Sequence, residues 1–187
     1  NGPWGICCDG ENVWVADYWS DSVLKIRGSD GQVVGNYTVG RAPRELCFDG
    51  ENIWVTKHLS DEVTKLRASD GEVRANIPVG RYPECICFDG ENIWVANSSD
   101  STVTKLRASD AEVLGNFTLH QGTHGLHCDG QYLWAANCVG DTVTKLRPDD
   151  GEQLAAFNLG KWTSPFKLCT EGDNVWVTNA GRDTGTK

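Results

Sequence analysis

The feature that most constrains the fold is a repeat that runs through the whole chain. A tryptophan preceded by an Asn/Tyr-aliphatic pair recurs at spacings of 40, 40, 40 and 42 residues, at Trp14, Trp54, Trp94, Trp134 and Trp176. A lysine followed by Leu or Ile recurs with it, at Lys25, Lys65, Lys105 and Lys145. A fixed period of about 40 residues with several short strands in each unit is typical of a propeller or a solenoid.

The third unit shows what one repeat contains. Extended segments are predicted at residues 85–88, 92–96, 102–107 and 112–119, because each is rich in β-branched or aromatic residues and bounded by turn residues. Asp89-Gly90 is a strong tight-turn signal between the first two. The fourth segment of the second unit carries Pro78, which only an edge strand tolerates, so the fourth strand is the outer edge. A four-stranded antiparallel meander on this period is a β-propeller blade.

We therefore predict an all-β protein, a single β-propeller over residues 1–187 with four full blades and a partial fifth. The expected blades are residues 1–40, 41–80, 81–120 and 121–160, and residues 161–187 supply the first two strands of the fifth. An open ring leaves an apolar sheet face bare, so we expect either a longer chain or a fifth blade completed by another molecule. The chain contains no methionine, and its first residue is not expected to be a nascent N-terminus.

The charge and hydropathy of the chain argue against two classes of partner. The formal net charge is −9, from 17 basic and 26 acidic side chains, and an acidic surface repels phosphate backbones. No apolar run approaches the roughly 18 residues that a membrane helix needs. We expect no nucleic acid partner and no membrane span.

Eight cysteines resemble a disulfide framework until they are placed on the repeat. Cys7, Cys47, Cys87 and Cys169 hold equivalent positions, which His127 fills in the fourth unit, and we interpret these cysteines as small buried apolar residues. Equivalent positions of neighbouring units lie about 10 Å apart, beyond the roughly 7 Å between Cα atoms that a disulfide spans. Cys85 and Cys138 remain a possible pair across adjacent units. The short Cys-x-x-Cys pairing of zinc sites is absent, so no metal site is predicted.

The repeat resembles those of a known family. Phe88-Asp89-Gly90, the run 92–97 (Asn-Ile-Trp-Val-Ala-Asn) and the run 102–106 (Thr-Val-Thr-Lys-Leu) are similar to the YVTN/YncE-type, NHL-like β-propeller repeats of bacterial and archaeal secreted or surface proteins. The resemblance covers essentially the whole chain and implies the fold, whereas propellers of this kind bind ligands, bind proteins or catalyse reactions. One enzyme of related fold is a streptogramin lyase, a seven-bladed magnesium-dependent propeller. Its catalytic His/Glu pattern has no residue-by-residue match in this sequence.

The segments before the first strand and after the second strand of each unit lie on one side of the disc, which we call the variable face. Their sequences change from unit to unit, while the Asp-Gly and Ser-Asp-Gly turns of the opposite side, the frame face, barely change. Repeats that keep their frame and vary one side suggest a binding face, although unconstrained loop drift gives the same pattern. Aromatic and Arg side chains suit recognition of proteins, sugar rings or anions. The candidate ligand-binding residues are Trp4, Tyr18, Trp19, Arg41, Arg44, His58, Arg81, Tyr82, Glu84, His124, Lys161 and Trp162.

Catalysis is the weaker interpretation of the same face. His120, His124 and His127 are closely spaced, but Gly122 and Gly125 exclude the helix that would align them. No Gly-x-Ser-x-Gly and no Gly-rich phosphate loop occurs, so no catalytic residue and no cofactor is predicted. The predicted function is a non-catalytic recognition or scaffold module that binds a protein or carbohydrate ligand. The alternatives are a lyase or hydrolase with His124 as its base, and a structural subunit that self-assembles through its incomplete blade.

Three Asn-x-Ser/Thr triplets bear on where the protein works. They begin at Asn36, Asn97 and Asn116, which are candidate glycosylation sites. Glycosylation, like the family resemblance, points to an extracellular or cell-surface protein. Buried free thiols are inert and do not oppose that location.

Overall fold

The computed structural model describes residues 2–181 and 184–186, and every regular element in them is a β-strand. The first two blades consist of β1 (Pro3–Cys8), β2 (Asn12–Asp17), β3 (Ser22–Arg27), β4 (Val33–Thr38), β5 (Pro43–Phe48), β6 (Asn52–Lys57), β7 (Glu62–Arg67) and β8 (Val73–Pro78). The next two consist of β9 (Pro83–Phe88), β10 (Asn92–Asn97), β11 (Thr102–Arg107), β12 (Val113–Thr118), β13 (Thr123–Cys128), β14 (Leu133–Asn137), β15 (Thr142–Leu146) and β16 (Gln153–Asn158). The fifth consists of β17 (Pro165–Glu171), β18 (Asn174–Asn179) and β19 (Thr184–Thr186).

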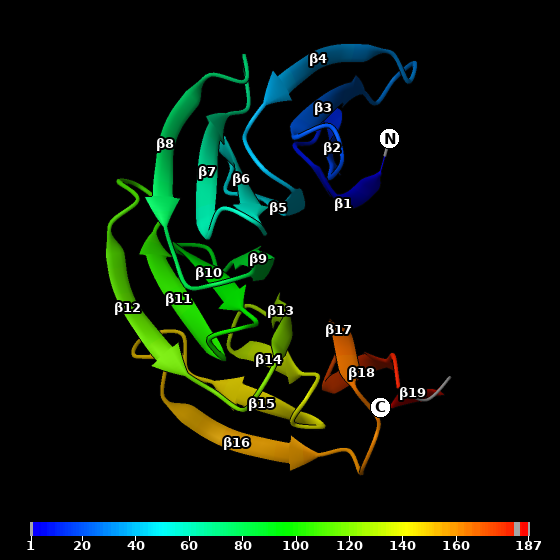
Figure 1. Ribbon diagram of the computed structural model, residues 1–187, viewed down its shortest axis with the longest axis vertical. Helices are drawn as coiled ribbons and strands as arrows, with labels where there is room; N and C mark the ends of the chain where they lie inside the picture. The colour runs from blue at the N-terminus through cyan, green and yellow to red at the C-terminus, as the bar shows by residue number, and fades with distance from the viewer. Residues whose placement is uncertain (1, 182–183, 187) are drawn as a thin grey trace.

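The strands form four antiparallel four-stranded sheets and one three-stranded sheet, each in chain order. The sheets are arranged as an open arc, with β1, β5, β9, β13 and β17 on the inside and β4, β8, β12 and β16 on the outside (Figure 1). The predicted β-propeller of four full blades and an incomplete fifth is confirmed. The fifth blade differs from the prediction in one respect, because backbone pairing of Val177 with Thr186 and of Asn179 with Thr184 adds a third short strand.

The repeated Asp-Gly-Glu-Asn-x-Trp segment fixes the first hairpin of a blade. In the first blade, Asp9 Oδ1 accepts hydrogen bonds from the backbone N–H of Glu11 and Asn12, and Asp9 Oδ2 accepts one from Trp14 Nε1 at 2.8 Å. Burial raises the pKa of Asp9, but these hydrogen bonds outweigh it and lower the pKa to about 2. One carboxylate therefore shapes the turn and orients the core tryptophan.

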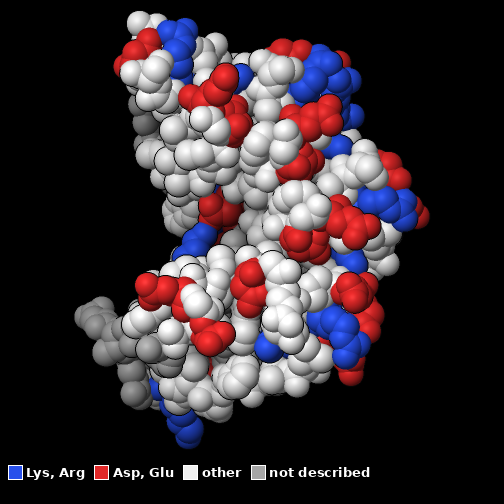
Figure 2. All heavy atoms as spheres, turned by 180° about the vertical axis from the view of Figure 1, so that it is seen from behind, with Lys and Arg blue, Asp and Glu red and all other residues white. Residues whose placement is uncertain are grey.

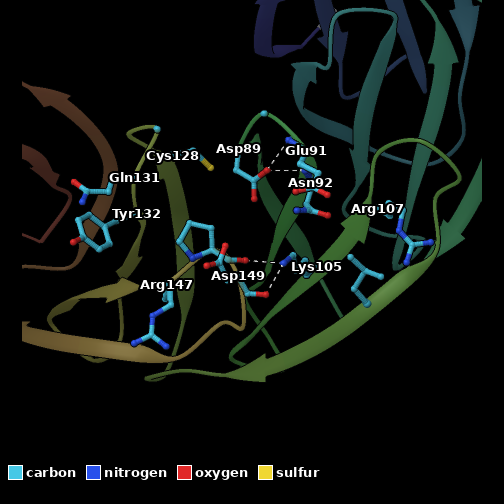
Figure 3. Close-up of a pocket in the computed structure, with 14 residues that line it drawn as sticks. Asp89, Glu91, Asn92, Lys105, Arg107, Cys128, Gln131, Tyr132, Arg147 and Asp149 are labelled. Atoms are coloured by element: carbon cyan, nitrogen blue, oxygen red, sulfur yellow. Dashed lines mark hydrogen bonds between the residues drawn. The ribbon is translucent and has the colours of Figure 1, made fainter.

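In the first three blades, the repeated lysine joins its blade to the next. Lys25 Nζ, Lys65 Nζ and Lys105 Nζ each donate to a backbone carbonyl in the third-to-fourth-strand turn of the following blade, at Ala68 (2.7 Å), Ala108 (2.7 Å) and Pro148 (2.6 Å). Each ammonium also lies about 5 Å over its own blade's tryptophan ring. Figure 3 draws the third junction, where Lys105 Nζ donates to the carbonyl oxygens of Pro148 and Asp149. We call this contact the lysine clasp.

The core lies between blades, and each blade's tryptophan is covered by the blade that follows. Trp14, Trp54 and Trp94 are fully buried among apolar residues of the next sheet. The repeat places Trp176 at the same position and so predicts that it too is a core residue, but this prediction is wrong, since Trp176 is 41% exposed on the outer face of the last blade. The prediction that the four equivalent cysteines are buried is also wrong: Cys7, Cys47 and Cys87 are half-buried, and Cys169 is exposed because no blade of the described residues follows it.

No described residue belongs to a helix with the length and hydropathy that a membrane crossing requires. Acidic and basic side chains are interspersed over the side of the molecule seen in Figure 2, and charged atoms of both signs reach the hollow of the arc.

Candidate functional site

The variable face is built by the strand pairing itself. The first residue of each inner strand pairs with the last residue of the second strand, as Pro43 does with Lys57 and Pro83 with Asn97. The segment before the first strand and the segment after the second strand therefore meet at the same end of each blade. Each inner strand has an irregular register directly after this pair, where the chain bulges before regular pairing resumes.

Several residues of the variable face have a backbone conformation with positive φ, which residues other than glycine rarely adopt. Ala42, Tyr82 and Trp162 have positive φ angles of 54°, 56° and 65°, at the position where the fourth unit has Gly122. The N–H of Tyr82 donates to Asp61 Oδ1 at 3.0 Å, and the N–H of Trp162 donates to Asp141 Oδ2 at 2.9 Å. A carboxylate of the preceding blade therefore fixes each strained residue, and two of these residues carry large aromatic rings. Strain of this kind concentrates at functional sites.

Just inside this backbone lies a row of five equivalent residues, one from each inner strand, that we call the axial row: Trp4, Arg44, Glu84, His124 and Phe166. Consecutive members of the row contact each other. Arg44 lies 4.4 Å over the ring of Trp4 and pairs with Glu84, and His124 follows, with its ring centroid 5.4 Å from that of Phe166. Close approach of the inner strands β13 and β17 requires Gly125, because a Cβ there would lie 2.3 Å from the carbonyl oxygen of Phe166. Each repeat thus contributes a chemically different side chain to one continuous row.

Glu84 is the centre of a buried charged cluster. Arg44 holds it in an ion pair, with Nη1 donating a hydrogen bond to Oε1 at 2.8 Å and Nε lying 2.8 Å from Oε2. His58 Nδ1 lies 3.3 Å from Glu84 Oε1, and His124 Nδ1 lies 3.8 Å from Glu84 Oε2. Only 5% of the Glu84 side chain is exposed. Burial raises the pKa of Glu84, and the nearby guanidinium of Arg44 opposes that rise.

The surroundings of the two histidines in this cluster favour the neutral form of each ring. Burial lowers the pKa of His58, and the positive charge of Arg44 lowers it further. The same two causes, burial first, lower the pKa of His124. His124 Nδ1 is buried and has no hydrogen-bond partner among the described residues. An unpaired buried nitrogen beside a carboxylate is a group that a ligand or a substrate can satisfy.

Aromatic rings border the cluster along one side, forming what we call the aromatic wall: Trp4, Tyr18, Trp19, His58 and Tyr82. The ring of Tyr18 lies 5.8 Å from that of Trp4 and 4.9 Å from that of Trp19. The ring of His58 stacks on that of Tyr82 at 4.8 Å. Trp4, Trp19 and Tyr82 are 54%, 75% and 46% exposed, so ring surface faces solvent directly beside the buried charges.

The structure brings together eight of the twelve predicted residues: Trp4, Tyr18, Trp19, Arg44, His58, Tyr82, Glu84 and His124. The other four lie on the variable face outside this group. Arg81 pairs with Asp100 at 2.6 Å, Arg41 and Lys161 are exposed, and Trp162 is 75% exposed at the fifth blade.

Sequence reasoning missed three residues of the site. Phe166 belongs to the axial row, and Lys167 pairs with Glu45 from the second blade, linking β17 to β5. The fifth unit has two extra residues before its inner strand, visible in its spacing of 42, so a fixed period of 40 does not align Phe166 and Lys167 with their equivalents. Alignment on the tryptophan does align them, because Phe166 lies ten residues before Trp176, as His124 lies before Trp134.

The closely spaced histidines do not form one site. His127 Nε2 contacts Thr170 Oγ1 at 2.9 Å, and His120 is exposed, while His124 faces Glu84 together with His58 from another blade. Among the described residues, no three His, Cys, Asp or Glu side chains are arranged to hold a metal ion.

One candidate glycosylation site is wrong and two are sterically open. Asn97 is fully buried, and its Nδ2 donates to Thr102 Oγ1 at 3.1 Å and to Thr104 Oγ1 at 2.8 Å, so no glycan can be attached there without unfolding the blade. Asn36 and Asn116 are exposed on the outer strands β4 and β12.

The frame face has its own hollows, one at each blade junction. A cavity of about 520 Å³ lies between the third and fourth blades, where Asp89, Lys105, Cys128 and Asp149 are among its lining residues (Figure 3). A similar cavity of about 490 Å³ lies between the first two blades and is lined by the corresponding Asp9 and Lys25. Because the same residue types recur at both junctions, these cavities belong to the repeated frame.

Comparison with known proteins supports the fold. No protein-family profile and no curated protein matches the chain. Among solved structures, the hydrazine synthase of Kuenenia stuttgartiensis is similar with a TM-score of 0.87 at 21% identity, over 95% of this chain and 55% of that chain. A functionally unknown protein of Desulfotomaculum acetoxidans has a TM-score of 0.80 at 17% identity, over 93% and 61%. The virginiamycin B lyase of Staphylococcus aureus has a TM-score of 0.65 at 15% identity, over 96% and 78%.

These similarities establish the propeller fold and nothing finer, because propellers of one architecture host unrelated functions. The chain spans little more than half the length of the first two structures. The YVTN/YncE-type resemblance remains a prediction, since no family profile matches.

Proposed function

We propose that this protein is a non-catalytic recognition module that binds its ligand on the variable face, over the axial row and against the aromatic wall. The observation that carries the proposal is the axial row itself. In a chain whose repeats keep the same turns, tryptophans and lysine clasps, the five equivalent side chains at its centre all differ and contact one another in sequence. A frame held constant around a varied centre is the arrangement expected of a binding site.

The chemistry of the site favours a glycan over a protein. Exposed rings of Trp4, Trp19 and Tyr82 provide flat surfaces on which sugar rings stack. The buried cluster beside them offers both donors and acceptors, and His124 Nδ1 is unpaired. Arg44 is already matched by Glu84, so the centre does not demand a strongly charged ligand. A neutral oligosaccharide fits these features best. A protein surface remains the second class of ligand.

Binding to an oligosaccharide panel tests the proposal. The wild-type chain is expected to bind at least one oligosaccharide, and Trp19→Ala is expected to weaken that binding by about tenfold or more, since a stacked aromatic contributes about 1–3 kcal/mol to comparable interfaces. Arg147→Gln, on the frame face, is the matched control and is expected to bind like the wild type. Equal loss in both variants would place the ligand elsewhere.

A hydrolase or lyase is the second candidate, favoured by one observation. His124 Nδ1 is buried, unpaired and 3.8 Å from Glu84 Oε2, and its lowered pKa keeps the ring neutral, as a general base requires. His124→Gln separates the two candidates. A recognition module shows no turnover in either form and keeps its affinity within a few fold, whereas an enzyme turns over the bound oligosaccharide as wild type and loses that turnover in the variant.

The proposed location is outside the cell or at its surface. The exposed Asn36 and Asn116 triplets and the family resemblance support it. Mass spectrometry of the native protein tests it, with glycans expected at these two residues and none at the buried Asn97.

A further inference from the structure

A pair of cysteines from neighbouring blades lies within bonding reach. Cys87 of β9 and Cys128 at the end of β13 have their sulfur atoms 2.6 Å apart, although they are separated by 41 residues in the chain. Non-bonded carbon atoms are about 3.5–4.0 Å apart at their optimal separation, and sulfur is larger than carbon. A disulfide bond is about 2.05 Å long. We propose that Cys87 and Cys128 form a disulfide that joins the inner strands of the third and fourth blades.

The surroundings single out this pair among the eight cysteines. Both side chains are half-buried and pack against the same apolar core between the third and fourth blades. The pairing of Cys85 with Cys138 that the sequence left open is wrong, because Cys85 Sγ lies 3.7 Å from the carbonyl oxygen of Leu126 and Cys138 interacts with Ser164 of the fifth blade. Sequence reasoning overlooked the true partners because they occupy non-equivalent positions of the repeat. Cys87 pairs with Trp94, and Cys128 pairs with Leu133.

The frame-face cavity gives an oxidant access to one of the two thiols. Cys128 lines the cavity of about 520 Å³ between the blades, as Figure 3 shows, whereas Cys87 is not among the lining residues. The thiolate of Cys128 attacks a small disulfide such as glutathione disulfide, forming a mixed disulfide and releasing one small thiol. The sulfur of Cys87 then attacks Cys128, forms the protein disulfide and releases the second small thiol. Two protein thiols are oxidised, and one small disulfide is reduced to two thiols.

The bond has a consequence for the variable face. The strands that it would join also carry Glu84 and His124, near their opposite ends. Fixing β9 against β13 restricts sliding of the third blade against the fourth and so restricts the spacing of these two axial-row residues. The disulfide therefore couples the redox state of the frame face to the rigidity of the centre on the variable face.

Peptide mapping of the full chain tests the proposal. The protein is incubated with glutathione disulfide, remaining thiols are alkylated, and the digest is analysed without reduction. The expected product is a peptide pair joining Cys87 to Cys128, and a melting temperature raised by roughly 10 °C relative to the reduced chain, given a closed loop of this size. Cys128→Ser is expected to lose both effects, and Cys138→Ser to retain both.

The wild-type map alone decides the outcome even when a variant fails to fold. Recovery of Cys87 and Cys128 as alkylated thiols after this treatment would overturn the proposal. Linkage of either residue to a different cysteine would overturn it as well.

Discussion

The lysine clasp offers a sharp test of how the blades are held together, because one chain supplies both the contact and its control. Lys65 is 8% exposed, and its Nζ donates to the carbonyl of Ala108 in the next blade at 2.7 Å. The same ammonium lies 4.9 Å from the centre of the Trp54 ring. Lys145, the equivalent residue of the fourth blade, lies 3.4 Å over Tyr132 and 5.2 Å over Trp134, and no carbonyl of the described residues accepts from it.

Lys65→Met keeps the aliphatic stem and removes the charge, so it isolates the clasp. A hydrogen bond to a charged group contributes about 1.5–3 kcal/mol, and a cation–π contact contributes about 0.5–1 kcal/mol. The variant also avoids the free-energy cost of removing the ammonium from water, which offsets part of these two losses. We expect Lys65→Met to lower the free energy of unfolding by about 2 kcal/mol. Lys145→Met loses only the ring contacts and is expected to lower it by at most about 1 kcal/mol.

Urea unfolding followed by tryptophan fluorescence measures both variants. Hydrogen exchange at the Ala108 N–H, which donates to the carbonyl of Glu91, reports on the clasped turn directly and is expected to accelerate only in Lys65→Met. Equal destabilisation by the two substitutions, with unchanged exchange at Ala108, would show that the lysines act through their own tryptophans and that the clasp contributes nothing.

Three further predictions follow from the same structure. Asp9→Asn should lower the free energy of unfolding by about 1 kcal/mol at neutral pH, since the folded pKa of about 2 lies below the unfolded value near 3.8 and solvent screens this partly exposed carboxylate. This stability is present above the unfolded pKa, so the gap between wild type and variant in urea titrations should close as pH falls from 4 towards 2. Tyr82→Gly should change the free energy of unfolding by no more than about 1 kcal/mol, because relief of the positive φ offsets the lost stack on His58, while oligosaccharide affinity falls. Gly122→Ala at the equivalent position should instead destabilise the fold, since its Cβ would lie 2.6 Å from Val139. A stable Gly122→Ala protein would refute the argument from backbone strain. The imidazoles of His58 and His124 should titrate below the ordinary histidine pKa of about 6.5 in NMR spectra of the folded protein, so their contribution to stability is present above that pH and is lost as pH falls below it; midpoints at or above the denatured-state value would contradict the neutral cluster.

The fold was predictable from the sequence because every blade repeats the same turn and strand sequence patterns. Asp9 and its equivalents define both a turn and the partner of a core tryptophan, and Pro78 marks the outer edge. Burial of Trp176 was predicted wrongly because it depends on a neighbouring blade, which no local pattern encodes. Residues whose environment comes from their own hairpin were therefore the easiest to predict.

The location of the candidate site was predictable from the sequence, but the contacts between its side chains were not. Variation between repeats identified the variable face and eight residues that meet there. The contacts of Glu84 with Arg44, His58 and His124 join three blades. Contacts between residues so far apart in the chain produce no local pattern in a single sequence. The same reason hid the approach of Cys87 to Cys128, since a repeat alignment compares equivalent positions and this pair is not equivalent.

The measurement that tests the central claim most directly is hydrogen exchange of the full chain with and without the oligosaccharide that it binds best. The account predicts slower exchange along the variable face, at residues 81–84, 121–124 and 161–166, and unchanged exchange in the frame-face turns at residues 89–92 and 129–132. Protection confined to the frame-face turns, or no binding by any oligosaccharide in the panel, would contradict it.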